Sequence, residues 1–129
     1  MKTFGCKCFE RQTKVDTILQ RLTDLDEITG ALIIGKDGLI VSGALPGDDE
    51  DMLGAMSAAV FGSIANFTMQ AVHGETQHAI IETDTGSVQF AAVGDLILVI
   101  TTGPGSNSGR VKFEMKKATR QLATLVAAY

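Results

Sequence analysis

The chain has 129 residues, which is enough for one ordinary domain. It is 45% hydrophobic but only 5% aromatic, so the composition excludes a disordered chain and favours a core of aliphatic side chains, Ala and Met. The formal net charge of −4 disfavours electrostatic binding to nucleic acid, which needs a basic footprint.

Residues 1–12 show neither a helical nor a strand period, and we predict an N-terminal tail there, followed by one domain over residues 13–129. The tail lacks the apolar region of a signal peptide. Its cysteines, Cys6 and Cys8, are too close together for a structural disulfide framework, so we expect a reduced, cytoplasmic protein. We expect no membrane span, because no apolar run reaches the length needed to cross a bilayer.

The first predicted helix begins at Thr13, which forms a capping box with Asp16. Its apolar residues recur at helical spacing: Val15, Ile18, Leu19, Leu22 and Leu25. Two apolar, β-branched runs follow, at 31–35 and 39–43, with Asp37-Gly38 between them. This pattern predicts a β-hairpin.

The second helix is predicted from Asp49 to Val72, after a break at Pro46-Gly47. The acidic run at 48–51 fits a helix N-terminus, and it lacks the alternating spacing of a calcium loop. One stripe of the helix is apolar and is expected to face a sheet: Leu53, Met56, Val60, Ile64, Phe67 and Ala71. A second stripe holds small residues: Ala55, Ala58, Ala59, Gly62, Ser63 and Asn66. The small stripe fits close packing either within one subunit or against a second backbone.

Three further strands are predicted, at 76–84, 87–93 and 96–102, separated by tight turns. A glycine-rich loop at 103–109 leads into a third helix that begins near Asn107 or Ser108. The buried stripe of this helix is Val111, Met115, Ala118, Leu122, Leu125 and Val126. Its outer face is basic and carries Arg110, Lys112, Lys116, Lys117 and Arg120. We interpret that face as solvated rather than as a nucleic-acid or acidic-membrane site.

The resulting element order, α-β-β-α-β-β-β-α, indicates an α+β fold with three α/β/α layers. The runs at 31–35 and 96–102 are continuously apolar, as in strands that are buried on both faces. Joining the two hairpin units through these strands gives a five-stranded antiparallel sheet of order 2-1-5-4-3. We expect the second helix to cover one face alone.

The strand at 76–84 then lies at an edge of the sheet and lacks the Pro, Lys and Arg residues that usually protect such edges. An unprotected edge beside a small-residue helix predicts a two-fold homodimer. The predicted interface consists of Ala55, Ala58, Ala59, Gly62, Ser63, Asn66, Gln77, His78, Ile80 and Glu82.

No catalytic, cofactor-binding or metal-binding set is predicted. A GxSxG elbow is absent, and Cys-x-Cys with His73 and His78 is not a recognised zinc spacing. The loop at 103–109 lacks the Walker A lysine, because Arg110 and Val111 follow Gly109. It also misses the GxGxxG pattern, because Ser108 stands in the place of the last glycine. We therefore expect a protein that is not an enzyme.

The segments GALIIGKDGLIVSG (30–43) and NSGRVKFEMKKA (107–118), with the small-residue helix between them, resemble prokaryotic Roadblock/LC7 domains of the MglB kind. The resemblance extends over residues 13–129. It implies a profilin-like sandwich, a homodimer through the second helix and the third strand, and binding of small Ras-like GTPases. The GTPase would meet the paired second helices, where we select Met52, Met56 and Met69. No arginine finger is assigned, because that helix contains no Arg.

The leading hypothesis is thus a homodimeric, non-enzymatic module that binds and regulates or scaffolds a small Ras-like GTPase. The alternative is a small-molecule sensor domain of similar sandwich fold, which needs a pocket between the sheet and a helix.

Overall fold

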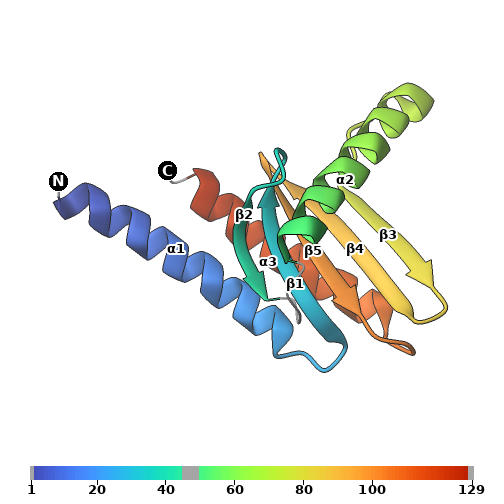
Figure 1. The fold of residues 1–129 in the computed structure, drawn as a ribbon, viewed down its shortest axis with the longest axis horizontal. Coiled ribbons are helices and arrows are strands. Elements are labelled where there is room, and N and C mark those ends of the chain that lie inside the picture. The colour runs from blue at the N-terminus through green and yellow to red at the C-terminus, as the bar shows by residue number, and fades with distance from the viewer. Residues whose placement is uncertain (1, 45–49, 128–129) are drawn as a thin grey trace.

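A computed structural model describes residues 2–44 and 50–127, and within them the elements follow the predicted order (Figure 1). The helices are α1 (Lys2–Thr23), α2 (Glu50–Val72) and α3 (Ser108–Ala127). The strands are β1 (Ile28–Gly35), β2 (Ile40–Ala44), β3 (His78–Thr83), β4 (Gly86–Val93) and β5 (Leu96–Thr102). The predicted break at Pro46-Gly47, with Asp48 and Asp49, lies outside the described residues.

Residues 2–12 are helical, because α1 is continuous from Lys2 and passes through the predicted boundary at residue 12 without a break. Thr13 is therefore inside the helix rather than at its N-terminus, and its carbonyl accepts a hydrogen bond from Thr17 Oγ1 at 2.9 Å. Once the amphipathic part from Val15 to Leu22 packs on the sheet, each preceding residue adds one hydrogen bond without a new nucleation cost. The segment 2–12 contains no proline, so nothing in it stops the helix.

The five strands form one antiparallel sheet of order β2-β1-β5-β4-β3, which confirms the prediction. β1 and β5 pair along their length, with Leu32 opposite Val99 and Ile34 opposite Ile97. All four of these side chains are buried. The continuous apolar character of both strands follows from their central position, because side chains on both faces of the sheet are covered.

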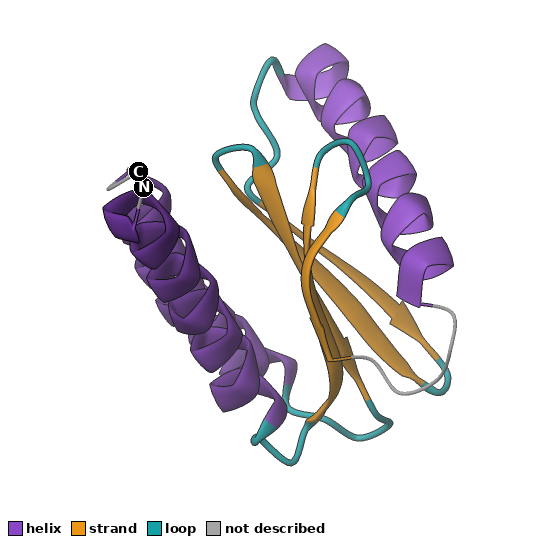
Figure 2. Cartoon of the chain, turned by 60° about the vertical axis from the view of Figure 1, so that its left-hand side comes forward, coloured by secondary structure: helices purple, strands orange, loops and turns teal. Residues whose placement is uncertain are grey.

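Helices cover the two faces of the sheet unequally (Figure 2). α1 and α3 lie side by side on one face, and α2 lies alone on the other, as predicted. The core has two parts as a result. The larger cluster lies under α1 and α3 and includes Leu19, Ile33, Leu98, Met115 and Leu122. The smaller cluster lies under α2 and contains Leu32, Ile34, Phe61, Phe90, Ile97 and Val99.

The face of α2 that meets the sheet differs from the expected stripe. Its buried residues are Gly54 and Phe61, and Ala58 packs beside them, whereas most of the predicted stripe is exposed. A Cβ atom added to Gly54 would lie 3.1 Å from Ile40 Cγ1 and 3.4 Å from the Gly38 carbonyl oxygen. The helix therefore approaches the β1–β2 hairpin through small residues, and most of its large apolar side chains other than Phe61 are exposed.

Replacing Gly54 by Leu should lower the free energy of unfolding by about 1–3 kcal/mol, because the side chain would have to displace the β1–β2 hairpin. Ala71→Leu, at an exposed position of the same helix, should change it by less than about 0.5 kcal/mol. Urea unfolding at one fixed protein concentration measures both. A Gly54→Leu protein as stable as the parent would contradict the close approach of α2 to the hairpin.

Candidate functional site

The outer face of α2 is an exposed apolar surface. Phe67 and Val72 are each 71% exposed and Met52 is 58% exposed, although all three are large apolar residues. The other large apolar side chains exposed on this helix are Leu53, Met56, Val60 and Met69. An apolar surface of this extent is typical of an interaction site rather than of a face in contact with water. Met52, Leu53, Met56, Val60 and Phe67 lie on the side of the helix that points away from Gly54 and Phe61, and we call these five side chains the α2 outer face. Met69 and Val72 share the side of Phe61 and are exposed near the end of the helix.

By length and composition, α2 meets the criteria for a membrane span, so the expectation that no apolar run is long enough was wrong. The reason is that Met52 to Val72 contains no charged residue, and its Ala residues add to the mean hydropathy of its larger apolar residues. Its Phe61 ring nevertheless packs on Phe90 of β4, with ring centroids 6.3 Å apart. Since Phe61 and Phe90 belong to the smaller core cluster, we interpret α2 as a layer of the fold.

The small residues predicted for an interface fall into two groups. Ala55, Ala59, Gly62, Ser63 and Asn66 are exposed on α2. No atom lies within 4 Å of a Cβ built on Gly62, so this glycine leaves open space beside the helix. Ala58, in contrast, is half-buried against the sheet. Packing within the subunit thus explains Ala58, whereas the other five residues are accessible to a partner.

The three methionines predicted to face a GTPase are all exposed, but they do not form one cluster. Met52 and Met56 are one helical turn apart and share the outward side of α2. Met69 lies 13 residues beyond Met56, or about 20 Å along the helix axis. The structure therefore groups Met52 with Met56 and places Met69 near the other end.

Strand β3 is at one end of the sheet, and its outer edge is unpaired in the part of the chain that the structure describes. Residues that pair directly across antiparallel strands share a face. Ala79 pairs with Phe90 of the smaller core cluster, so Ala79 and Ile81 face the α2 side. The predicted interface residues on the strand face the α3 side instead: His78, Ile80 and Glu82. Gln77 precedes the strand.

The end of α2 is attached to the segment that leads into β3. His73 adopts the left-handed conformation, with φ of 57°, and ends the helix. Thr68 Oγ1 then donates to the Gly74 carbonyl at 3.1 Å, and it lies 2.6 Å from Thr76 Oγ1. These bonds hold the α2 outer face and the free β3 edge in a defined relation.

His78 lies among cations on the α3 side of the sheet. Its Nε2 is 2.9 Å from Oε1 of the buried Gln89. Burial lowers the pKa of His78, the hydrogen bond to Gln89 opposes this, and Lys112 and Lys116 lower it further. Among the described residues, Gln89 Nε2 is the buried side-chain atom that lacks a hydrogen-bond partner.

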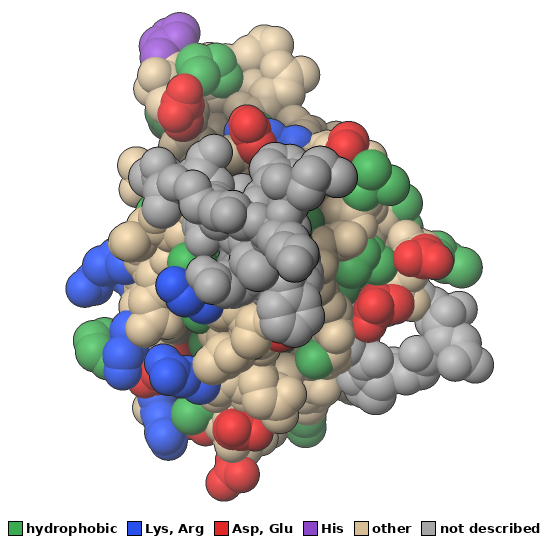
Figure 3. Space-filling view, turned by 90° about the vertical axis from the view of Figure 1, so that its left-hand side faces the viewer, with side chains coloured by type: hydrophobic (Ala, Val, Ile, Leu, Met, Phe, Trp, Pro, Cys, Tyr) green, Lys and Arg blue, Asp and Glu red, His purple; other side chains and the backbone are tan. Residues whose placement is uncertain are grey.

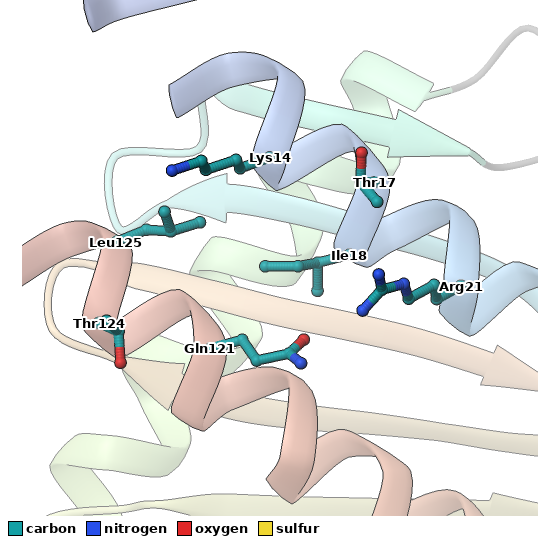
Figure 4. A pocket seen from close by; sticks show the side chains of 7 residues that line it. All are labelled: Lys14, Thr17, Ile18, Arg21, Gln121, Thr124 and Leu125. Atoms are coloured by element: carbon teal, nitrogen blue, oxygen red, sulfur yellow. The ribbon is translucent and has the colours of Figure 1, made fainter. Parts of the chain in front are cut away.

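Two hollows bear on ligand binding. The larger, of about 370 Å³, lies between α1 and α3 on the outer surface rather than beneath a helix (Figure 4). Figure 4 shows Lys14 and Arg21 of α1 at its rim, with Ile18 and Leu125 between the two helices. The second, of about 190 Å³, lies beside His78 and Lys116, between the sheet and α3. It is smaller than typical small-molecule pockets, which measure about 300–1,000 Å³.

Charge is distributed unevenly over the surface. Lys and Arg side chains gather on one flank in Figure 3, apart from most of the Asp and Glu side chains in that view. Helix α3 contributes five basic residues to the chain and one acidic residue, Glu114. Arg110 pairs with Glu27 at 3.3 Å, and Asn107 Oδ1 caps the helix by accepting from the Arg110 backbone N–H at 3.1 Å.

The sequence analysis missed the exposure of Phe67, Val60 and Leu53, which it placed against the sheet. The signal was the same uncharged run in α2: a helix that is apolar all round must bury more than one face. One face of α2 meets the sheet, and the opposite face is exposed in a single subunit.

The Roadblock/LC7 domain family matches residues 14–102. An uncharacterised protein of Methanocaldococcus jannaschii, MJ1340, is 30% identical over 112 residues, which cover 86% of this chain and 98% of the relative.

Solved structures show the same fold. Myxococcus xanthus MglB superposes with a TM-score of 0.85 at 21% identity, covering 91% of this chain and 90% of that chain. A structure described as MglB with tetrameric arrangement gives a TM-score of 0.80 at 16% identity, covering 89% of each chain. On the family match over most of its length, this chain belongs to the Roadblock/LC7 domain family.

Proposed function

We propose that the chain acts in the cytoplasm as a homodimeric, non-enzymatic module that binds a small Ras-like GTPase and regulates or scaffolds it. The observation that carries the homodimer is the combination of the α2 outer face with the free β3 edge in one subunit. A two-fold axis at that edge pairs two β3 strands and brings two α2 helices together on one face of a continuous sheet.

The exposed small residues support this arrangement. Ala55, Ala59 and Gly62 let a second helix approach closely, as small residues do at tight helix contacts. Phe67 and Ile81, which are 71% and 40% exposed, would lose contact with water in the same step. The MglB structure with a tetrameric arrangement shows that a protein of this fold self-associates.

The proposal that the partner is a GTPase rests on membership of the Roadblock/LC7 family. Regulatory rather than catalytic roles are typical of Roadblock/LC7 domains, and the fold is similar to that of Myxococcus xanthus MglB. Met52 and Met56 supply a flexible, polarizable contact surface at the beginning of α2. Phe67 and Val72 lie toward its other end, so one helix offers separate regions for a second subunit and for a GTPase.

The small-molecule sensor remains the second candidate, on the observation of the 190 Å³ hollow between the sheet and α3. Its volume holds only a very small ligand, which favours the protein-binding function.

The dimer is tested by replacing each of two exposed phenylalanines, in separate variants, with Glu. Phe67→Glu should convert the dimer to a monomer at micromolar concentration, because association would bury a carboxylate. Phe113→Glu, on the outer surface of α3 and 61% exposed in the parent, should leave the dimer intact. Sedimentation velocity distinguishes these outcomes, and a parent protein that sediments as a monomer at micromolar concentration would contradict the proposal.

The proposed GTPase partner is tested by titration with a small Ras-like GTPase from the same organism, in its GDP and GTP forms. We expect the dimer to distinguish the two nucleotide states. Met56→Glu should weaken binding about tenfold or more by placing a charge in an apolar contact. Glu114→Lys on α3 serves as the control. Equal, undetectable binding of both nucleotide forms would count against the GTPase as partner.

A further inference from the structure

We infer that two copies pair through β3 in a single register, centred on Ile80, and that this register places Glu82 of each copy opposite His78 of the other. The inference rests on the proposed homodimer and adds the alignment of the two strands and the charged contact that selects it.

The free backbone groups of β3 belong to alternate residues. The backbone N–H of Ala92 donates to the Gln77 carbonyl at 3.0 Å, which marks these two as a hydrogen-bonded pair. Such pairs alternate along an antiparallel ladder, so Ala79 and Ile81 also direct their N–H and C=O groups toward β4. The residues whose groups point outward are His78, Ile80 and Glu82.

Symmetry then restricts the pairing. A two-fold axis perpendicular to the sheet keeps both α2 helices on the same face, so a residue must pair with one that faces the same side. An axis at Ile80 pairs Ile80 with itself and His78 with Glu82, so every outward residue of the strand exchanges backbone hydrogen bonds. An axis at Ile81 leaves His78 without a partner inside the strand. The Ile80 register therefore makes more hydrogen bonds.

This register brings together charges that a single subunit keeps apart. Within one strand, the Cα atoms of His78 and Glu82 are about 13 Å apart, because Glu82 lies four positions after His78 along the strand. In the Ile80-centred pair, the partner's Glu82 Cα would lie about 5.5 Å from the His78 Cα, as in any hydrogen-bonded antiparallel pair.

The surroundings of His78 suit a carboxylate. Lys112 and Lys116 on α3 act on His78 electrostatically. In the described part of the chain, an ion pair joins Arg110 to Glu27, and neither lysine forms one. The 190 Å³ hollow lined by His78 and Lys116 leaves room for the incoming side chain. The partner's Glu82 would supply the missing negative charge.

Dimerisation should consequently depend on pH. The groups that face His78 are Gln89 from β4 and Lys112 and Lys116 from α3. In a subunit without its partner, burial and the two lysines favour the neutral form of His78. A carboxylate opposite His78 raises its pKa, so association takes up protons. The dissociation constant should then decrease as the pH falls from about 7.5 to about 6, and His78→Gln should remove that dependence.

Charge reversal tests the contact. Glu82→Lys should raise the dissociation constant roughly 2- to 30-fold, since two cross-strand charge pairs of modest strength are lost per dimer. Adding Lys116→Glu should restore part of the affinity. Asp84→Lys is the matched control, because it makes the same charge change at a residue that would face His78 only in the Ile81-centred register.

Cysteine crosslinking tests the register directly, in a protein in which Cys6 and Cys8 are replaced by Ser. Two Ile80→Cys residues, about 5.5 Å apart between Cα atoms, are within the range of a disulfide and should crosslink on mild oxidation. Ile81→Cys should crosslink poorly, because its outward neighbour in this register is Ala79 of the partner.

The outcomes separate this inference from the proposed function. The register would be overturned, but not the dimer, if Ile81→Cys crosslinks efficiently or if Glu82→Lys leaves the dissociation constant unchanged. A monomeric parent protein would overturn both. A last measurement uses inorganic phosphate with the monomeric Phe67→Glu subunit. If phosphate shifts the NMR signals of His78, and Glu82→Lys leaves the dissociation constant of the dimer unchanged, then His78 and its two lysines bind a free anion and the contact with Glu82 is overturned.

Discussion

The structure depends on one geometric mismatch: a five-stranded sheet has two faces to cover, and this chain supplies helices for them unequally. Five strands about 4.8 Å apart form a face roughly 19 Å wide between the outer strand axes, whereas an α-helix with its side chains is about 10–12 Å across. Two helices cover that width and one does not. α1 and α3 enclose the larger core cluster, whereas α2 leaves Ile81 of β3 40% exposed on its side.

The unfilled side carries the features that a partner requires. The uncharged run of α2 presents large apolar side chains outward, and the neighbouring strand ends the sheet with free backbone groups. Each feature alone would favour nonspecific association, because a bare edge strand pairs with many sequences. Together, and held in place by the bonds from Thr68 to the segment before β3, they restrict the partner to one that offers a strand and a small-residue helix at once. A second copy of the chain has both.

In the proposed dimer, electrostatics selects the alignment of the two β3 strands. The apolar face supplies most of the affinity in the proposed dimer, but it does not distinguish one strand alignment from the next. The cations around His78 and the carboxylate of Glu82, at opposite ends of one short strand, make such a distinction. Specificity from modest charge pairs and affinity from apolar burial is a common division in protein interfaces. In the proposed dimer, this division would leave the beginning of α2, with the exposed Met52 and Met56, for the proposed GTPase.

Much of the fold was predictable from local sequence because its signals are local. The apolar runs of β1 and β5, the Asp37-Gly38 turn and the Asn107 cap identified the elements, and the two buried strands gave the order of the sheet. The beginning of α1 was not predictable, since a helix extended by propagation needs no amphipathic period of its own.

The orientation of α2 shows what only the tertiary structure decided. Its composition established that it carries two unlike stripes, and small residues alone do not say which stripe meets the sheet. The close approach of Gly54 to the β1–β2 hairpin put the small residue Ala58 and the Phe61 ring inward, and left Phe67 and the methionines outside. Likewise, pairing with β4 decided which residues of β3 face α3. The sequence by itself determined the elements, their order and the bare edge, because these follow from period and turn chemistry; burial on each face was decided by packing between distant segments.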